Sequence, residues 1–229
     1  MKQFILLLLA VPVFFSCSRE YYPTTVNAPF FSEAGEFEAS ILTGNSGLDL
    51  HLAYAVADQF ALMANGSYAD RNEENNSTFF ENNHKHIFGE FGVGYFLPSE
   101  NAFRFEVYGG YGMGQMEGTY STSSSFFYDT DDAFYRKIFL QPQVGVSNNV
   151  FEGGISTRFT SIILSSPDVG RDNTGFFMQP VIVSKVGYKY IKFIGEIGLS
   201  IPLNSEQIEF DYAPLIMSVG VNFSFGNYE

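Results

Sequence analysis

The sequence predicts an all-β fold: a closed antiparallel, up-and-down transmembrane β-barrel of about ten strands, with eight strands as the fallback. Apolar and polar side chains alternate with a period of two from Glu36 onward. Short turns alternate with long polar loops between these segments. Charged residues make up only 16% of the 229 residues, whereas the outer wall of a barrel in water would carry many.

Charge and cysteine content exclude several classes of protein. Asp plus Glu number 25 against 12 Lys plus Arg, a net charge of −13, which argues against a nucleic-acid partner because such proteins need a basic surface. The single Cys excludes a disulfide framework and a cysteine-based zinc site. Beyond the N-terminus, no apolar run reaches the roughly 18 residues of a membrane-spanning helix.

The first 17 residues, MKQFILLLLAVPVFFSC, are typical of a bacterial lipoprotein signal. A short basic region at Lys2 precedes an apolar run too short to span a bilayer, and Ser16 stands before Cys17. We expect residues 1–16 to be removed and Cys17 to be acylated, since two or more acyl chains give stable anchoring. The alternative is an ordinary cleaved signal that leaves a free thiol.

Residues 17–35 are predicted to form the lipidated N-terminus and a tether, and residues 36–229 the barrel. The tether segment carries two prolines, several small polar residues and no periodicity, which favours a partly extended linker. Its aromatic pair, Phe30 and Phe31, is a candidate for contact with the barrel.

The alternating pattern predicts ten strands, long enough to cross a membrane at a tilt. They are 36–44, 47–56, 60–70, 85–97, 103–118, 134–146, 149–162, 175–186, 190–202 and 210–225. The tight connections are 57–59, 98–102, 147–149 and 187–189, and the long polar ones are 71–84, 119–133, 163–174 and 203–209. Short turns at one end and long loops at the other are the plan of an outer-membrane barrel.

Two arrangements fit the alternation: the apolar faces point outward to lipid, or inward around an apolar cavity. The polar faces consist mainly of Gly, Ser, Asn and Gln with few charges, which favours a narrow polar lumen and an apolar outer wall. Acids and bases of several strands would then meet in the lumen as an ion-pair network. Its members are Glu38, Asp49, His51, Glu90, Arg104, Glu106, Lys137, Glu152, Arg158, Lys192 and Glu196.

Aromatic residues near both strand ends predict girdles at the two membrane interfaces. The predicted turn-end girdle is Tyr54, Phe60, Phe96, Phe103, Tyr188, Tyr190 and Phe225. The predicted loop-end girdle is Tyr68, Phe88, Tyr120, Tyr135, Phe159, Phe177 and Tyr212. Pro142 and Pro180 lie within predicted strands, where proline removes a ladder donor, so we expect β-bulges there or near the ends of the paired segments.

Several segments together resemble a known family. They are the lipoprotein-type signal, the Tyr-Tyr-Pro-Thr segment at 21–24, AYAVADQFALMANGSYAD at 53–70 and SVGVNFSF at 218–225. They look like small bacterial outer-membrane β-barrel proteins, broadly OmpA-like, over residues 36–229. The last strand is similar to the C-terminal signal read by the barrel-assembly machinery, followed here by residues 226–229; its apolar positions are Val219, Val221, Phe223 and Phe225.

No arrangement of catalytic residues emerges, so we expect no enzyme. His84 and His86 could hold a metal, as could the acidic run 129–132, but both lack the further ligands that zinc or calcium sites use. We predict no catalytic residue, no metal site and no cofactor.

We therefore expect a structural or accessory role in the outer membrane: surface interaction, envelope integrity, or a subunit of a larger outer-membrane complex. One alternative is a narrow channel or transporter for a small solute or lipid. Another is a soluble lipid-anchored binder similar to a lipocalin. Expected partners are outer-membrane lipids, lipopolysaccharide and the barrel-assembly machinery, with the lipid-anchored N-terminus on the periplasmic side.

Overall fold

The computed structural model describes residues 21–74, 80–99, 101–122, 128–165, 172–208 and 210–226. Within these ranges, side chains are described except for residues 71–74, 80–84, 118–122, 128–132 and 207. The predicted signal peptide, residues 1–16, and Cys17 lie outside the described residues. No helix in the described ranges is long and apolar enough to cross a membrane.

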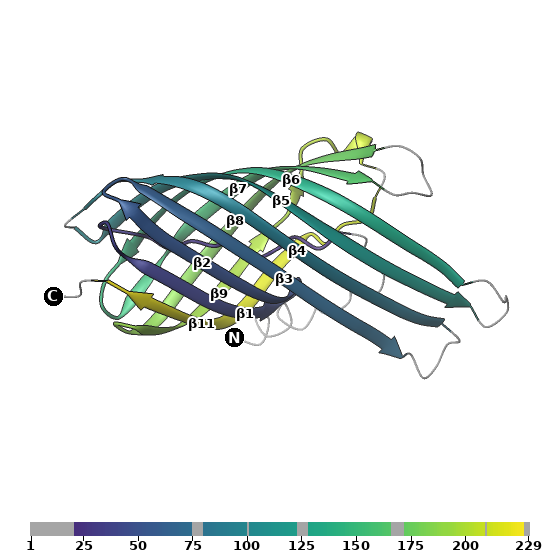
Figure 1. The fold of residues 1–229 in the computed structure, drawn as a ribbon, viewed down its shortest axis with the longest axis horizontal. Helices are drawn as coiled ribbons and strands as arrows, with labels where there is room; N and C mark the ends of the chain where they lie inside the picture. The colour runs from purple at the N-terminus through teal and green to yellow at the C-terminus, as the bar shows by residue number, and fades with distance from the viewer. Residues whose placement is uncertain are drawn as a thin grey trace, which may run out of the picture.

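The chain forms a closed antiparallel barrel of ten strands in up-and-down order (Figure 1). These are β1 (Phe37–Gly44), β2 (Gly47–Ala57), β3 (Phe60–Glu74), β4 (Phe80–Phe96), β5 (Phe103–Thr122), β6 (Tyr128–Ser147), β7 (Phe151–Ser165), β8 (Asp172–Tyr188), β9 (Ile191–Leu199) and β11 (Leu215–Phe225). The two-residue β10 (Ile201–Pro202) pairs with β8 beyond the end of β9, and the 3₁₀ turn η2 (Ser205–Gln207) follows it. Because β11 pairs with both β9 and β1, the ring closes and the predicted fold class with ten strands is confirmed.

The two ends of the barrel differ, as the connection lengths predicted. The turn end carries the connections 58–59, 97–102, 148–150 and 189–190, and the opposite end is the loop end. Strands β3 to β6 run further toward the loop end than the sequence pattern predicted, since β4 begins at Phe80 and β6 at Tyr128. Backbone pairing needs no apolar alternation, so it continues through polar residues beyond the apolar band.

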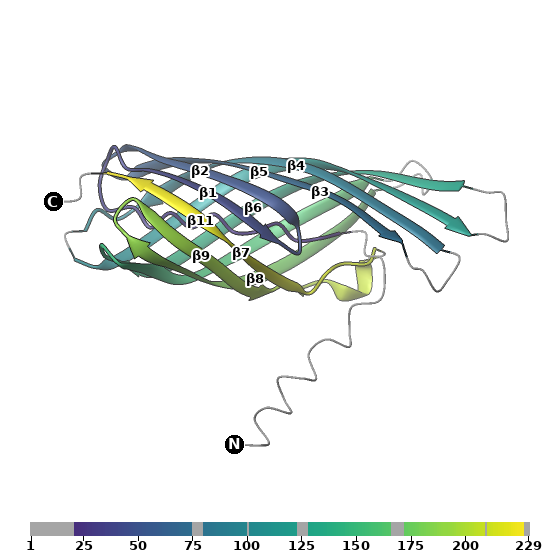
Figure 2. The same ribbon diagram turned by 90° about the horizontal axis from the view of Figure 1, so that it is seen from below.

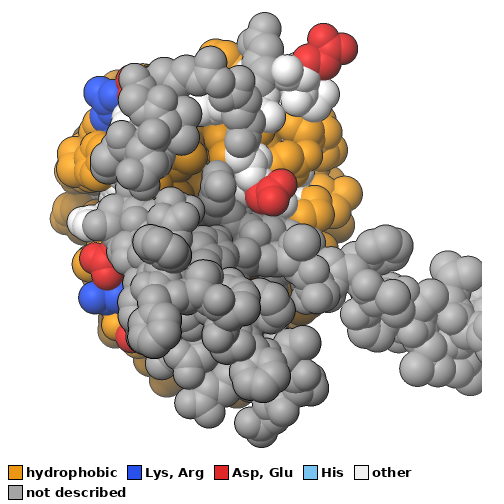
Figure 3. Space-filling view, turned by 90° about the vertical axis from the view of Figure 1, so that its right-hand side faces the viewer, with side chains coloured by type: hydrophobic (Ala, Val, Ile, Leu, Met, Phe, Trp, Pro, Cys, Tyr) orange, Lys and Arg blue, Asp and Glu red, His pale blue; other side chains and the backbone are white. Residues whose placement is uncertain are grey.

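The outer wall of the barrel is apolar, and the alternation therefore has its apolar face outward. Phe193 is 75% exposed and Ile138 58% exposed, whereas Arg158 on the inner face is fully buried. Seen from the loop end, apolar side chains appear around the outside of the barrel (Figure 3). Antiparallel strands place successive side chains on opposite faces, so one period-two pattern builds both surfaces.

Part of the predicted aromatic girdles is wrong. Phe96 of the turn-end set and Phe88, Tyr135 and Phe177 of the loop-end set are buried inside the barrel. They pack against other rings and apolar groups of the lumen, which gives them a core role. The outward-facing turn-end aromatics are exposed, namely Tyr54, Phe60, Phe103, Tyr188, Tyr190 and Phe225.

The β-bulges predicted at the two prolines are also wrong. The β6–β7 register is the same on both sides of Pro142, with a gap in pairing between Leu140 and Gln143. Beside Pro180, the pairing of β8 passes from β10 to β9 without a change of register. A missing N–H removes a ladder bond but inserts no residue, so the ladder is interrupted and the register is kept.

Candidate functional site in the barrel lumen

Residues 21–32, here called the lumen thread, run through the inside of the barrel from the loop end to the turn end (Figure 1, Figure 2). At the loop end, the Tyr21 N–H donates to the Asp211 carbonyl at 2.9 Å, and the Ala213 N–H donates to the Tyr21 carbonyl at 2.9 Å. At the turn end, the Phe31 and Phe96 ring centroids lie 5.9 Å apart. Residues 21–32 of the segment expected to be a tether therefore lie within the barrel, and Tyr21 lies at the end opposite to the expected periplasmic one.

The thread has a sequence suited to a narrow lumen. Residues 21–31, YYPTTVNAPFF, contain no charged side chain. Pro23 and Pro29 lack an N–H and favour extended backbone, so the thread has fewer donors to satisfy. Phe30 has a φ of 59°, a left-handed conformation uncommon for a residue with a side chain. This bend directs the rings of Phe30 and Phe31 into different apolar clusters.

Three apolar clusters fill the lumen, and each contains thread residues. The loop-end cluster packs Tyr21 among Phe88, Tyr135, Phe177 and Phe210. The middle cluster joins the thread to inward-facing wall residues and consists of Val26, Ala28, Phe30, Leu42, Val181, Val183, Ile194 and Ile216. The turn-end cluster surrounds Phe31 with Ala53, Ala55, Ala61, Met63, Phe96, Tyr108 and Phe139. The thread is thus part of the core of the barrel.

Wall side chains bind the backbone of the thread along its length. Both donors and acceptors of the wall take part: Val26 N–H to Glu196 Oε2 at 3.1 Å, Gln141 Nε2 to the Asn27 carbonyl at 2.7 Å, Lys185 Nζ to the Pro29 carbonyl at 3.4 Å, and Phe31 N–H to Glu106 Oε1. A buried backbone group without a partner is costly, and these bonds remove that cost.

Thread side chains add further polar contacts. Lys137 Nζ donates to Thr24 Oγ1 at 2.9 Å, and Thr25 Oγ1 lies 2.8 Å from His51 Nε2. Asn27 Nδ2 donates to Asn65 Oδ1 at 2.7 Å. Each polar side chain of the thread between Thr24 and Asn27 therefore meets a polar group of the wall.

A central ion cluster lies on the inner wall of β4, β6 and β7. The Glu90 carboxylate is 2.7 Å from Lys137 Nζ and 3.2 Å from Arg158 Nη2. Asn65 Nδ2 donates to Glu90 at 2.7 Å, and Gln141 Oε1 accepts two bonds from Arg158 at 2.7 and 2.9 Å. Paired charges with added hydrogen bonds are the form in which buried ions are tolerated.

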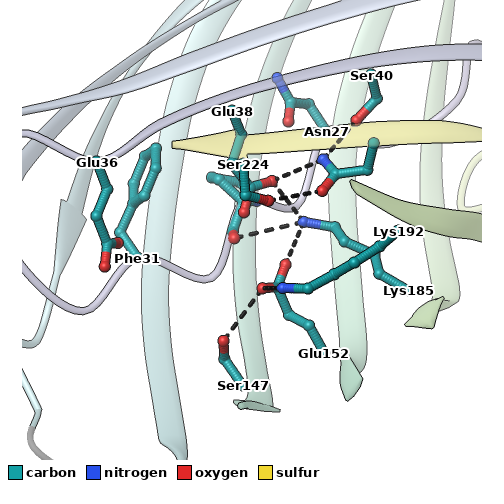
Figure 4. Close-up of polar contacts among 12 residues, drawn as sticks. Asn27, Phe31, Glu36, Glu38, Ser40, Ser147, Glu152, Lys185, Lys192 and Ser224 are labelled. Atoms are coloured by element: carbon teal, nitrogen blue, oxygen red, sulfur yellow. Dashed lines mark hydrogen bonds and ion pairs between the residues drawn. The ribbon is translucent and has the colours of Figure 1, made fainter. Parts of the chain in front are cut away.

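A second ion cluster lies near the turn end (Figure 4). Lys185 Nζ pairs with Glu38 at 2.6 Å and also with Glu152, and Lys192 Nζ pairs with Glu152 at 3.0 Å. Asn222 Nδ2 donates to Glu38 at 3.1 Å. Two lysines and two glutamates balance one another here, and the cluster joins β1, β7, β8 and β9.

All eleven side chains predicted for the lumen network are buried. Six of them belong to the two ion clusters, namely Glu38, Glu90, Lys137, Glu152, Arg158 and Lys192. The other five have no ion-pair partner among the described residues and are Asp49, His51, Arg104, Glu106 and Glu196. Glu106 and Glu196 accept thread N–H groups, and Arg104 donates to backbone carbonyls of the 97–102 turn.

Lys185 and the position of the thread inside the barrel were not predicted from the sequence. Lys185 follows Val181 and Val183 on the inner face of β8, where apolar residues occupy both faces and obscure the alternation. Those valines face inward because they pack against Val26, Ala28 and Phe30. For the thread, the one feature of the sequence that could have indicated a place inside the barrel was the uncharged, proline-containing composition of residues 21–31.

A cavity of about 970 Å³ lies at the turn end, beyond the thread's Phe30. Its lining includes Glu33, Glu36, Arg104 and Glu152. Burial raises the pKa of Glu36, an effect partly offset by hydrogen bonds from Ser32. The turn end of the lumen therefore contains a hollow with several charged residues in its lining.

The remaining predicted site residues have varied outcomes. Val219, Val221, Phe223 and Phe225 lie on the outward face of β11. His86 is buried in the lumen, with Nε2 2.7 Å from the Tyr135 hydroxyl. The side chains of His84 and of the acidic run 129–132 are outside the described set. Among the side chains that are described, no three His, Cys, Asp or Glu residues gather as a metal site would require.

No protein-family model and no curated protein matches this sequence. The geometry itself defines the class: a closed ten-stranded antiparallel β-barrel with an apolar outer wall and a lumen filled by its own N-terminal segment.

Proposed function

We propose that this protein is an integral outer-membrane β-barrel lipoprotein with a structural or accessory, non-catalytic role. The observation that carries the proposal is the combination of an apolar outer wall with a lumen closed by the chain's own thread. Such a barrel would offer its loops and outer wall to the envelope rather than a pore or a reaction site.

The apolar outer wall supports a membrane location. Large apolar residues are exposed on all ten strands of the barrel, whereas monomers in water rarely expose contiguous apolar patches beyond a few hundred Å². A transmembrane barrel presents such a band to lipid. A lipocalin-like binder would need the reverse, an apolar cavity and a polar exterior, so the wall argues against that alternative.

The filled lumen argues against an open channel in the described state. An eight- to ten-stranded barrel is narrow enough for side chains to fill, and here the thread occupies it as well. Transport of a small solute would require the thread to leave. A structural or accessory role is therefore the better-supported proposal.

The proposed role includes the partners expected from the sequence. Outer-membrane lipids and lipopolysaccharide would contact the wall and loops, and the barrel-assembly machinery would read Val219, Val221, Phe223 and Phe225 on the outward face of β11. The proposed signal, residues 1–16, would direct acylation of Cys17. A larger outer-membrane complex is a further candidate partner for this surface.

The test is gel mobility of heated and unheated samples from purified outer membranes, together with extraction by urea. We expect a folded species that migrates differently until boiled and that stays in the membrane in urea. Mobility independent of heating, with release of the protein by urea after its lipid is removed, would contradict an integral barrel.

A further inference from the structure

The direction of the lumen thread carries a consequence for membrane topology. Tyr21, its first residue, is held at the loop end by residues 211–213. Phe31 lies at the turn end beside Phe96, and β1 then starts at Phe37, also at the turn end. The chain therefore travels the length of the lumen before it forms the first strand of the wall (Figure 2).

The thread is long enough to cross the whole apolar band. An extended chain spans at most about 3.3–3.6 Å per residue, so the ten steps from Tyr21 to Phe31 reach up to about 36 Å. The apolar band of an outer-membrane barrel is about 25 Å tall. The thread is therefore long enough for its two ends to lie on opposite sides of that band.

The contacts of the thread mark it as a fixed part of the folded barrel. It contributes to all three apolar clusters and supplies the N–H donors that Glu106 and Glu196 accept. Without the thread, these two buried carboxylates would lose those partners. The path of the chain through the lumen is therefore a property of the folded protein.

On the basis of the proposed outer-membrane location, we propose that the chain crosses the membrane inside its own barrel, with the residues before Tyr21 on the cell-surface side. Long loops of outer-membrane barrels face outward and short turns face the periplasm. The partner of this end of the chain is then the outer leaflet, which would receive acyl chains attached to Cys17.

The distance between Cys17 and Tyr21 decides between the two leaflets. The four steps that separate them reach at most about 14 Å. A return to the periplasmic side would require crossing an apolar band about 25 Å tall. An acylated Cys17 can therefore reach the outer leaflet beside the loop end but not the inner leaflet.

The experiment uses the full chain in cells and three separate single-cysteine additions. Glu20→Cys reports on the residue before Tyr21, Glu206→Cys on the loop end and Asp58→Cys on the turn end; the last two positions are exposed. Intact and lysed cells are treated with a membrane-impermeant maleimide. The unaltered chain serves as a control because an acylated Cys17 has no free thiol, and heat-modifiable mobility confirms that each variant folds.

We expect Glu20→Cys and Glu206→Cys to react in intact cells, and Asp58→Cys only after lysis. Reaction of Glu20→Cys only after lysis, while Glu206→Cys reacts in intact cells, overturns the proposed topology and leaves the outer-membrane barrel standing. If Glu206→Cys also requires lysis, or if Asp58→Cys reacts in intact cells, the proposed location or orientation of the barrel is what fails.

Discussion

At the scale of single residues, the buried glutamates of the lumen fall into two kinds. Glu90 neutralises two cations, Lys137 and Arg158. Glu196 has no cation within ion-pair distance among the described residues and accepts the N–H of Val26. Burial alone therefore does not define the role of a lumen acid, since one is a counter-ion and the other a hydrogen-bond acceptor for the thread.

Because of this difference, we expect replacement by glutamine to destabilise the barrel at Glu90 and to be tolerated at Glu196. Glu90→Gln would leave Lys137 and Arg158 without their counter-charge, and breaking a buried ion pair from one side costs about 3–5 kcal/mol. Glu196→Gln keeps a side-chain oxygen for Val26 and removes an ionisable group that has no ion-pair partner among the described residues. We expect the first variant to lose its heat-modifiable form at a clearly lower temperature, and the second to match or exceed the unaltered protein.

The measurement is the temperature at which the fast-migrating folded band disappears. Equal losses for the two variants would mean that the charge of Glu90 contributes nothing beyond its hydrogen bonds. A larger loss for Glu196→Gln would show that the carboxyl group of Glu196 is essential to holding the thread.

At the scale of strands, glycines on the inner face of β4 and β5 make room for aromatic rings of the lumen. A Cβ atom at Gly94 would lie 2.2 Å from Cε1 of Tyr108. At Gly89 on the outward face of the same strand, the nearest atom to a Cβ would be the Asn65 carbonyl oxygen at 3.9 Å. The two faces of β4 thus differ sharply in the space that they leave.

We expect Gly94→Val to destabilise the barrel and Gly89→Val to be tolerated. Overpacking a filled core costs about 1–3 kcal/mol, whereas an outward valine suits the exposed, apolar face of a β-strand. Thermal unfolding followed by circular dichroism, in detergent micelles, compares the two variants. A similar unfolding temperature for both would mean that the Tyr108 ring can move aside without cost.

At the scale of the whole molecule, the lumen is closed by residues that belong to the chain's own N-terminal segment. The thread contacts a lysine of each ion cluster, Lys137 and Lys185, and a cavity of about 970 Å³ lies at the turn end. We therefore expect conduction through the barrel to depend on the thread as well as on the number of strands.

The intact protein in a planar lipid bilayer is expected to show no steady conductance. A variant in which residues 21–31 are replaced by a Gly and Ser segment of equal length should conduct, because that segment lacks the side chains of the three apolar clusters. Steady conductance of the intact protein would contradict closure by the thread. Absence of conductance in the variant, with its heat-modifiable band retained, would mean that wall side chains alone close the lumen.

Local pattern was sufficient to predict the wall of the barrel. The period of two assigns inward and outward faces from neighbouring residues, and the contrast between turns and loops sets the order of the strands. All eleven predicted lumen residues are buried for this reason. The prediction was weakest where inner residues are apolar, as at Val181 and Val183, because both faces then look alike in sequence.

The sequence by itself determined a ten-stranded barrel with an apolar exterior and charged groups in its lumen. Each of these properties follows from the alternation of apolar and polar residues one or two positions apart. Only the tertiary structure decided that residues 21–32 fill that lumen and in which direction they run. Their contacts join distant parts of the chain, as between Val26 and Glu196, which are 170 positions apart. An uncharged extended segment carries the same local pattern outside a barrel as inside one, so its place depends on the closed wall that surrounds it.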